Sequence, residues 1–348
     1  MTGAATMPAA HLNTDSIKRL GVIGSGSIVP FHLDALQAAG FEIAAIGTRA
    51  GSERSAALAD RYGAALADSW QDVLSAPGLD ALLIAPETSV TTDILTAALE
   101  QTELPILVEK PISYSSADLA GLLSRPQSDL DRVLVGYNRR HYSSTAAVAA
   151  FLGAQGIANA TFHASIPEAS WDSAMADDRK RGILLANSVH VLDLLQHLFG
   201  ELAIAGVSGV QNESGLVSRA VSFNSASGAV GTTIITFGSP SGYFVDIHTP
   251  GKSASLKPIE FFNEFVGVQV IDPTPEVPLR HYVPTRGAAF SLSQDDLDFK
   301  PGFLGQSREL FALAAGGTEA LPISARRSAS LADAHRILVL AEQLLAAL

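Results

Sequence analysis

Two glycines near the start of the chain, Gly24 and Gly26, lie directly after an apolar run and before an amphipathic stretch. This is the order strand, turn, helix, with Pro30 in the first helical turn. Backbone N–H groups at such a helix start can donate to a pyrophosphate, so the loop predicts a dinucleotide site. The loop residues expected to contact the dinucleotide are Gly24, Ser25, Gly26, Ser27 and Ile28. Val29 replaces the third small residue of the usual pattern, which leaves a simple tight turn as the alternative.

The residues after the second apolar run indicate which dinucleotide is bound. An NAD-binding domain usually has an acid there that accepts the ribose 2′-hydroxyl, but no Asp or Glu occurs between Glu42 and Glu53. Thr48 and Arg49 stand at this place. A hydroxyl and a guanidinium would bind a 2′-phosphate by charge-assisted hydrogen bonds, whereas a carboxylate would repel it. The sequence therefore predicts that NADP is preferred over NAD as the cofactor. The alternative is that Arg49 is only a solvated loop residue.

Residues 17–140 must supply the elements that position these loops. Short apolar runs alternate with helical patterns, which is typical of βαβ units on a parallel sheet. Strands are expected at 18–24, 41–48, 79–86, 104–111 and 132–138, and helices at 27–40 and 52–63. The pattern predicts an α/β fold with an N-terminal Rossmann domain, a doubly wound parallel sheet. Ala85 and Pro86, which end one of the expected strands, are counted among the cofactor contacts.

Residues 141–348 differ in pattern and predict a second domain for substrate binding and oligomerisation. Strand-like runs joined by Gly, Ser and Asn suggest an open, largely antiparallel sheet. These runs are 158–166, 203–211, 215–224, 229–238 and 264–271. A helix is expected over 184–200, and the helical segments 303–316 and 330–348 can pack back onto the Rossmann domain. Residues 1–16 show no periodic pattern and are expected to be a mobile extension.

Composition narrows the function classes. The chain has 348 residues, of which 47% are hydrophobic and 17% charged, which suits two compact folded domains. It has no cysteine, so cysteine nucleophiles and thiolate metal sites are excluded and redox chemistry needs a cofactor. The net charge of −12 argues against a nucleic-acid surface. No run has the length of a membrane span or the features of a signal peptide, so we expect a cytoplasmic protein without a membrane partner.

Four motifs together resemble the family of glucose-fructose oxidoreductase, inositol dehydrogenase and MocA. They are GVIGSGSI at 21–28, LVEKPIS at 107–113, GYNRRH at 136–141, and the helix with His190 and Asp193. Their order covers nearly the whole chain, and VEKP is the most specific of them. The resemblance implies a Rossmann domain, an α/β domain with an open sheet, homodimers or homotetramers formed through that sheet, and sugar-like or polyol substrates.

The resemblance implies that Lys110 of the EKP motif lies beside the nicotinamide and the substrate. A partly desolvated lysine near a positively charged nicotinamide has its ammonium form disfavoured, so its pKa falls toward the working range of an acid–base group. A salt bridge or a phosphate contact is the alternative. Glu109 is expected to contact the cofactor or to orient the loop, and the Lys110–Pro111 peptide is a candidate for the cis form.

The second catalytic element of the family is commonly an aspartate four residues before a histidine. Here the histidine is His190, but the residue four positions earlier is Ala186, followed by Asn187. Asn187 and His190 can share a helix face, so Asn187 is predicted to bind a substrate hydroxyl while His190 exchanges or orients the proton. An amide cannot relay a proton, and the usual triad is incomplete. The alternative is a hydrogen-bonded core histidine, with Asp193 one turn further along as a structural residue.

Three further residues are candidates for binding. Arg140 best matches the recurrent arginine of the family, and it either clamps an anionic group of the substrate or ties the domains together. Asn138, from the same motif, is expected among the cofactor contacts. Trp171 is expected to offer a sugar-stacking face in the substrate pocket, with a core tryptophan as the equal alternative.

These features predict a metal-free NAD(P)-dependent oxidoreductase that moves hydride between nicotinamide C4 and a hydroxyl or keto carbon. The predicted catalytic residues are Lys110, His190 and Asn187, and the predicted substrate contacts are Lys110, Arg140, Trp171, Asn187 and His190. One alternative is a glycosidase or lyase that cycles a tightly bound NAD within each turnover. The other is a non-catalytic dinucleotide-binding protein, an alternative supported by Ala186.

Overall fold

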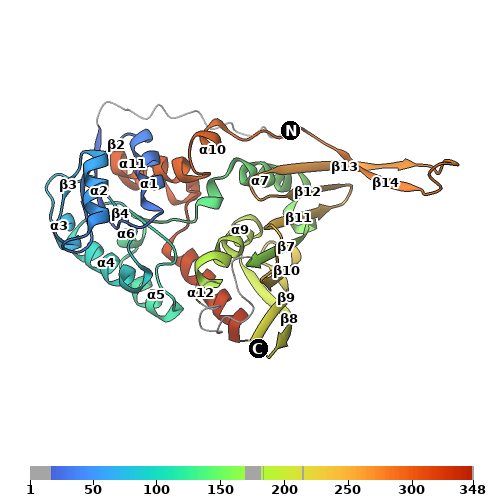
Figure 1. Ribbon diagram of the computed structural model, residues 1–348, viewed down its shortest axis with the longest axis horizontal. Coiled ribbons are helices and arrows are strands. Elements are labelled where there is room, and N and C mark those ends of the chain that lie inside the picture. The colour runs from blue at the N-terminus through green and yellow to red at the C-terminus, as the bar shows by residue number, and fades with distance from the viewer. Residues whose placement is uncertain (1–16, 169–181, 183, 214, 347–348) are drawn as a thin grey trace. The chain divides into compact units, whose positions relative to one another are not determined.

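The computed structural model describes residues 17–168, 182, 184–213 and 215–346 (Figure 1). The chain divides into two compact units, each made of separate segments. The N-terminal unit contains the described chain up to Glu109, with Arg125–Gly136 and Phe303–Arg326. The C-terminal unit contains Lys110–Ser124, Tyr137–Gly302 and the described chain from Arg327. The division is therefore interleaved, whereas the sequence pattern places one boundary at residue 140.

The N-terminal unit is built on a six-stranded parallel sheet with the order β3-β2-β1-β4-β5-β6. This is the strand order of a doubly wound dinucleotide-binding fold, so the predicted Rossmann architecture is confirmed. The strands are β1 (Lys18–Ile23), β2 (Phe41–Gly47), β3 (Ala65–Leu66), β4 (Ala81–Ile84), β5 (Ile106–Val108) and β6 (Val133–Val135). Every residue of β4, β5 and β6 is buried, as parallel strands covered on both faces require.

Helix α11 belongs to this N-terminal unit although it lies near the end of the chain. Its Leu310 and Phe311 are part of the same buried core as Leu20 and Leu33, and the Phe311 ring meets Phe41 edge-on at 5.4 Å. The helices of the unit are α1 (Val29–Ala38), α2 (Glu53–Tyr62), α3 (Trp70–Leu74), α4 (Thr88–Gln101), α6 (Gln127–Leu130), α11 (Phe303–Ala320) and the 3-10 turn η4 (Ile323–Ala325).

The C-terminal unit is built on an eight-stranded sheet with the order β14-β13-β12-β11-β7-β10-β9-β8. Among the described strands of this sheet only β7 and β10 pair in parallel, so the expected open, largely antiparallel sheet is confirmed. The strands are β7 (Thr161–Glu168), β8 (Leu202–Asn212), β9 (Gly215–Ser225), β10 (Val230–Phe237), β11 (Phe244–Thr249), β12 (Lys252–Leu256), β13 (Phe262–Ile271) and β14 (His281–Arg286). Strands β11, β12 and β14 are not among the strands expected from the sequence.

Helix α9 packs on the buried face of this sheet, where the Phe199 ring stacks on Phe162 of β7 at 4.4 Å. Strand β7 alternates accordingly, with Phe162, Ala164 and Ile166 buried. The remaining elements of the unit are α5 (Ser116–Leu123), α7 (Ser143–Gln155), α9 (Val189–Phe199), α10 (Gln294–Asp298), α12 (Leu331–Ala346), the 3-10 turns η1 (Asn138–His141) and η2 (Ile157–Asn159), and the π-helical turn η3 (Leu184–Ser188). None of the helices that the structure describes is long and apolar enough to cross a membrane.

Candidate functional site

The loop after β1 meets the loop after β4 at a glycine. Gly24 has φ +131°, and a Cβ on it would lie 2.2 Å from the carbonyl oxygen of Ala85, so only glycine fits there. Its N–H donates to the carbonyl of Gly47 at the end of β2 (3.2 Å). The carboxyl ends of three strands therefore converge here, with Ala85 buried and Pro86 half-buried beside the loop. Strands β1 and β4 are also where the strand order reverses, which is where open α/β sheets bind ligands.

The backbone at Gly26 has the features of an anion cradle. A Cβ on Gly26 would meet no atom within 4 Å, so the space beside it is open. Within the described part of the chain, no acceptor is placed against the backbone N–H groups of Ser25, Gly26 and Ser27. Helix α1 follows with Ile28 at its N-cap, which offers no side-chain cap, and with no acid in its first turn. These N–H groups at a positive helix end fit a dinucleotide pyrophosphate.

Hydroxyl groups gather where β2 leads into α2. The Thr48 Oγ1 lies 3.2 Å from the Ser55 Oγ, which in turn donates to the Ser52 Oγ at 2.9 Å. Ser52 caps α2 by accepting the N–H of Ser55 (3.2 Å). Arg49 is exposed next to this cluster in the chain, and Glu53 is an exposed acid in the first turn of α2. Thr48 and Arg49 were predicted from the sequence but the two serines were not, although the preference for serine at a helix N-cap could have revealed them.

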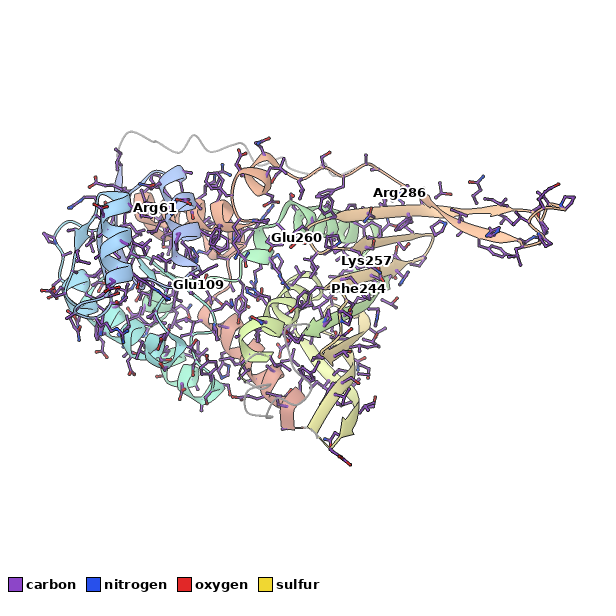
Figure 2. All side chains as sticks on the ribbon, in the orientation of Figure 1. Arg61, Glu109, Phe244, Lys257, Glu260 and Arg286 are labelled. Carbon is purple, nitrogen blue, oxygen red and sulfur yellow. The ribbon has the colours of Figure 1, made fainter. Side chains whose placement is uncertain are left out.

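Glu109, labelled in Figure 2, joins three elements of the N-terminal unit. Its Oε1 lies 2.6 Å from the Nε2 of the fully buried His32 on α1. The other ring nitrogen of His32 lies 3.4 Å from the Nε2 of Gln306 on α11, and the ring packs on Phe303 at 4.5 Å. Both contacts fit a ring that donates to Glu109 and accepts from Gln306. They support an orienting role for Glu109, while its expected contact with the cofactor stays a prediction.

In the C-terminal unit, Lys110 directly follows Glu109 in the chain, and its peptide bond to Pro111 is cis, as expected. Lys110 is half-buried, and its Nζ donates to the carbonyl oxygen of Ala186 in the turn η3 at 2.9 Å. The position where the resemblance implies an acid therefore offers a backbone carbonyl to the lysine.

His190 lies one residue inside α9 and has an unpartnered ring nitrogen. Its Nδ1 is buried, and no residue in the described ranges accepts from it or donates to it. The ring meets Tyr137 edge-on at 6.0 Å. Burial lowers the pKa of His190 well below its ordinary value, and the positive charges of Lys110, Arg139 and Lys300 lower it further. The imidazole is therefore neutral near pH 7, and its buried Nδ1 has no partner among the described residues.

Asn187 does not share the surroundings of His190. It is exposed, and its side chain hydrogen bonds to Glu168, the last residue of β7. Glu168 also accepts hydrogen bonds from the Ser188 hydroxyl and from the Tyr243 hydroxyl (3.1 Å). Burial raises the pKa of Glu168, although these hydrogen bonds and the nearby Arg139 oppose the rise. Glu168 was not predicted from the sequence; it continues the buried alternation of β7 with an acid in place of an apolar residue.

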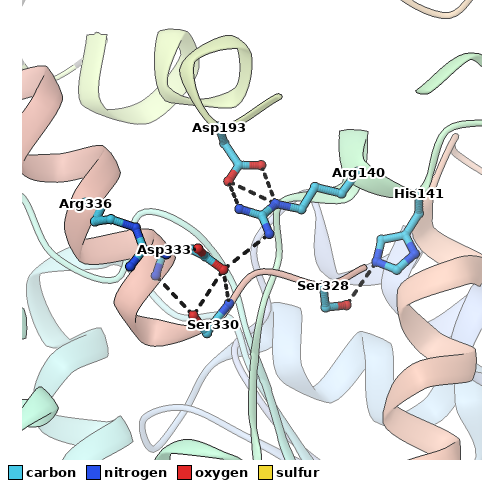
Figure 3. A network of polar contacts seen from close by, with 7 residues as sticks. All are labelled: Arg140, His141, Asp193, Ser328, Ser330, Asp333 and Arg336. Atoms are coloured by element: carbon cyan, nitrogen blue, oxygen red, sulfur yellow. Dashed lines mark hydrogen bonds and ion pairs between the residues drawn. The ribbon is translucent and has the colours of Figure 1, made fainter. Parts of the chain in front are cut away.

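Arg140 is engaged in a buried ion pair (Figure 3). Its Nε and Nη2 donate to the two carboxylate oxygens of Asp193 on α9 at 2.9 and 2.6 Å, and its Nη1 donates to Asp333 on α12 at 3.3 Å. Burial acts to lower the pKa of Arg140, but the two carboxylates outweigh it and raise the pKa. These contacts favour a structural tie, here within the C-terminal unit, over a clamp on the substrate, and Asp193 has the structural role expected of it.

Two other residues were predicted to contact the cofactor and the substrate, Asn138 and Trp171. Asn138 is buried, and its amide donates to the carbonyl of Pro301 at 3.0 Å and lies 3.4 Å from the Tyr142 hydroxyl. Its expected contact with the cofactor stays a prediction. Trp171 lies outside the described residues.

Comparisons with known proteins agree with this architecture. Residues 18–137 match the model of an oxidoreductase family with an NAD-binding Rossmann fold. Inositol 2-dehydrogenase from Corynebacterium glutamicum is 33% identical over 125 residues, which cover 35% of this chain and 37% of the relative. The chain thus matches about a third of the length of this curated relative.

Two solved structures show the fold over nearly the whole chain. An oxidoreductase from Agrobacterium radiobacter in complex with NAD+, L-tartaric acid and magnesium has a TM-score of 0.69 at 17% identity, covering 95% of this chain and 97% of that one. A protein described as an NADPH-dependent oxidoreductase from Desulfitobacterium hafniense has a TM-score of 0.74 at 13% identity, covering 96% of each chain. At these identities the likeness concerns the fold alone.

Proposed function

Through residues 18–137 the chain belongs to the Gfo/Idh/MocA family of oxidoreductases, and from this we propose that it transfers hydride between a nicotinamide dinucleotide and a sugar-like or polyol substrate. The observation that carries the proposal is the Gly24–Gly26 loop, which combines open space, N–H groups without acceptors in the described chain and a position at the switch in strand order. These features favour a loop that binds a dinucleotide pyrophosphate over a plain tight turn.

We propose NADP as the preferred dinucleotide. The support is the hydroxyl cluster of Thr48, Ser52 and Ser55 with Arg49 adjacent, since hydroxyl and guanidinium donors favour a 2′-phosphate. Glu53 is a nearby carboxylate, but it lies in the first turn of α2 and not at the end of β2. The fold does not decide the question, because similar structures are described with NAD+ and with NADPH.

When bound, the dinucleotide supplies nicotinamide C4 as the hydride acceptor or donor. Lys110 takes up or returns the proton of the substrate hydroxyl, and its bond to the Ala186 carbonyl holds the Nζ in place. His190, neutral and with Nδ1 unpaired in the described chain, accepts a hydrogen bond from the same substrate. Asn187 binds a second hydroxyl group. We propose a polyol or sugar-like substrate because the relative from Corynebacterium glutamicum is an inositol 2-dehydrogenase.

The test is transfer of a labelled hydride. The protein is incubated with NADP+ or NAD+ and a panel of polyols deuterated at the reacting carbons, with myo-inositol first, and reduced nicotinamide is examined for deuterium at C4 by mass spectrometry. The proposal expects deuterated cofactor, which is lost in a Lys110→Met variant. Binding of dinucleotide with no transfer from any polyol would favour the non-catalytic alternative. In a parallel incubation with glycosides in place of the polyols, breakdown of a glycoside without net reduced cofactor would favour the internally cycling glycosidase or lyase.

We propose that copies of the chain associate through the open face of the C-terminal sheet. Exposed apolar side chains support this, since Val210, Val230 and Ile234 on β8 and β10 are 57, 47 and 40% exposed. Light scattering coupled to gel filtration should give a dimer or tetramer, and an Ile234→Glu variant should shift the mass toward the monomer. A monomeric wild-type protein would contradict the proposal.

A further inference from the structure

Glu168 is a carboxylate placed where the fold expects an apolar side chain. It ends β7 and is 1% exposed, and it continues the inward series of Phe162, Ala164 and Ile166. A buried carboxylate costs several kcal/mol unless donors satisfy it, so its surroundings must be specific. They are, because three polar side chains from two other segments donate to it.

Two of these donors lie on the turn that receives Lys110. The Nζ of Lys110 donates to the carbonyl of Ala186, and the next two residues, Asn187 and Ser188, both hydrogen bond to Glu168. Three consecutive residues of η3 therefore connect the lysine to the carboxylate. A π-helical turn is rare and needs local support to persist. Glu168 supplies two of its bonds.

A charged group, Arg139, lies beside this arrangement. The guanidinium of Arg139 lies 5.1 Å over the ring of Tyr243, whose hydroxyl donates to Glu168, and Arg139 also interacts electrostatically with the carboxylate. Ionised Glu168 can accept from all three donors, since its two oxygens carry about four acceptor positions. Protonated Glu168 lacks the charge that strengthens these hydrogen bonds and carries a proton of its own, which the Ser188 or Tyr243 hydroxyl can accept by turning its O–H. The amide nitrogen of Asn187 can only donate, so its bond is the one that protonation weakens without a replacement.

We propose that Glu168 is a positioning residue: its ionised carboxylate holds the turn η3 so that Lys110 and Asn187 keep their working positions, and protonation releases Asn187. This rests on the proposed function, from which Lys110 and Asn187 take their roles. Glu168 itself does not touch the reacting atoms. Because burial raises its pKa, the release falls at a less acidic pH than an ordinary glutamate would give.

The kinetic test compares Glu168→Gln, Glu168→Asp and Tyr243→Phe with the wild type, with myo-inositol or the polyol that the panel selects and saturating dinucleotide. Glu168→Gln should lower kcat roughly 10- to 100-fold with the Kd of the dinucleotide unchanged, because a small displacement of Lys110 is costly. The Glu168→Gln variant should also lose the acidic limb of the plot of kcat against pH. Glu168→Asp, which keeps the charge, should recover part of kcat and keep the limb. Tyr243→Phe, which removes one donor only, should keep the limb with a smaller loss.

A second arm needs no turnover and so separates this proposal from the hydride-transfer proposal. The protein is labelled at glutamate carboxyl carbons and asparagine side-chain amides for NMR. The Glu168 signal is identified as the one that is absent from the Glu168→Gln variant. It should titrate with a pKa above the ordinary glutamate value of about 4.3. The Asn187 amide signal should move with the same midpoint. Titration of Glu168 without any response of Asn187 would overturn the proposal, whatever the activity. So would a Glu168→Gln protein that is less stable but has an unchanged kcat and acidic limb.

Discussion

The Nζ of Lys110 donates to the main-chain carbonyl of Ala186 at 2.9 Å, so in this contact the ammonium meets a neutral dipole and not a carboxylate. A neutral acceptor fixes the position of the amine without stabilising its charge as strongly as an ion pair would. The contact holds the amine nitrogen in a defined place, as proton transfer to or from a substrate requires.

Lys110→Met should therefore lower kcat by about 10²–10⁴-fold while the Kd of the dinucleotide stays near the wild-type value. Methionine keeps the length of the side chain and removes the ammonium. The measurement is steady-state turnover together with a fluorescence titration of the dinucleotide. Lys257→Met, at a lysine that packs over the Phe244 ring (Figure 2), is the matched control and should stay near wild-type turnover. If Lys110→Met chiefly weakens the dinucleotide, the lysine is a phosphate contact.

Arg49→Asp should reverse the choice of dinucleotide. A charge-assisted contact with the 2′-phosphate contributes about 1.5–3 kcal/mol, so the wild type should bind NADP roughly tenfold or more tightly than NAD. The variant should bind NAD more tightly, because a carboxylate accepts the free 2′-hydroxyl and repels the phosphate. Titration calorimetry with both dinucleotides measures this. Thr48→Val, which removes a hydroxyl only, should weaken NADP alone. Equal affinities in the wild type would remove the argument.

His190→Asn should depress turnover by roughly 10²-fold with dinucleotide affinity near normal. The buried Nδ1, which has no partner in the described ranges, is the reason to expect a substrate contact. Since the pKa of His190 is lowered well below its ordinary value, the imidazole stays neutral through the neutral range and should not itself produce a limb in the pH profile there. Unchanged turnover would mean that His190 only packs against Tyr137.

Arg140→Met should destabilise the protein by about 3–5 kcal/mol, because it leaves the buried carboxylate of Asp193 without its partner. Urea unfolding measures the difference in the free energy of unfolding. Arg61→Ala is the comparison, since its pair with Asp34 is 57 and 44% exposed and is worth no more than about 1 kcal/mol. The double variant Arg140→Met with Asp193→Leu should be more stable than Arg140→Met alone. A small loss in the single variant would contradict a structural role for the pair.

His197 should make the protein less stable in mild acid. Burial, and then the charge of Arg140, lower its pKa to about 4, against about 6.5 in the unfolded chain. Between these values the unfolded chain binds a proton that the folded protein does not, so the free energy of unfolding falls as the pH drops through this window, by up to roughly 3 kcal/mol. His197→Gln should flatten this part of the stability curve in urea titrations at a series of pH values. Parallel curves for variant and wild type would refute the assignment.

The parallel sheet could be predicted because its strands are continuous apolar runs, such as Ala81–Ile84, separated by helical patterns. The strands Phe244–Thr249, Lys252–Leu256 and His281–Arg286 escaped prediction because they carry polar or exposed residues at many positions and form no continuous apolar run. The two-residue strand Ala65–Leu66 is too short for any pattern.

The candidate site also contains residues that the sequence reveals and residues that it does not. Gly24, Gly26 and Lys110 stand in local motifs that a sequence displays directly. No local motif reveals the partners of Glu168 and Glu109, because Tyr243 lies 75 residues from Glu168 and His32 lies 77 residues from Glu109. The family resemblance points to Arg140, but only the fold shows that Asp193 and Asp333 engage it. Such pairings are set by tertiary packing, which one sequence does not reveal.

The interleaved segments also constrain how the protein is made. The dinucleotide-binding unit closes its core only with α11, whose Leu310 and Phe311 pack among residues of β1, β2 and α1. A ribosome that has released residues 17–140 has therefore not yet supplied the helix that covers this apolar surface. We expect the core of the unit to remain incomplete until the whole C-terminal sheet has been translated, since all of its strands precede Phe303. Its maturation during synthesis is thus tied to the rate at which the intervening strands emerge.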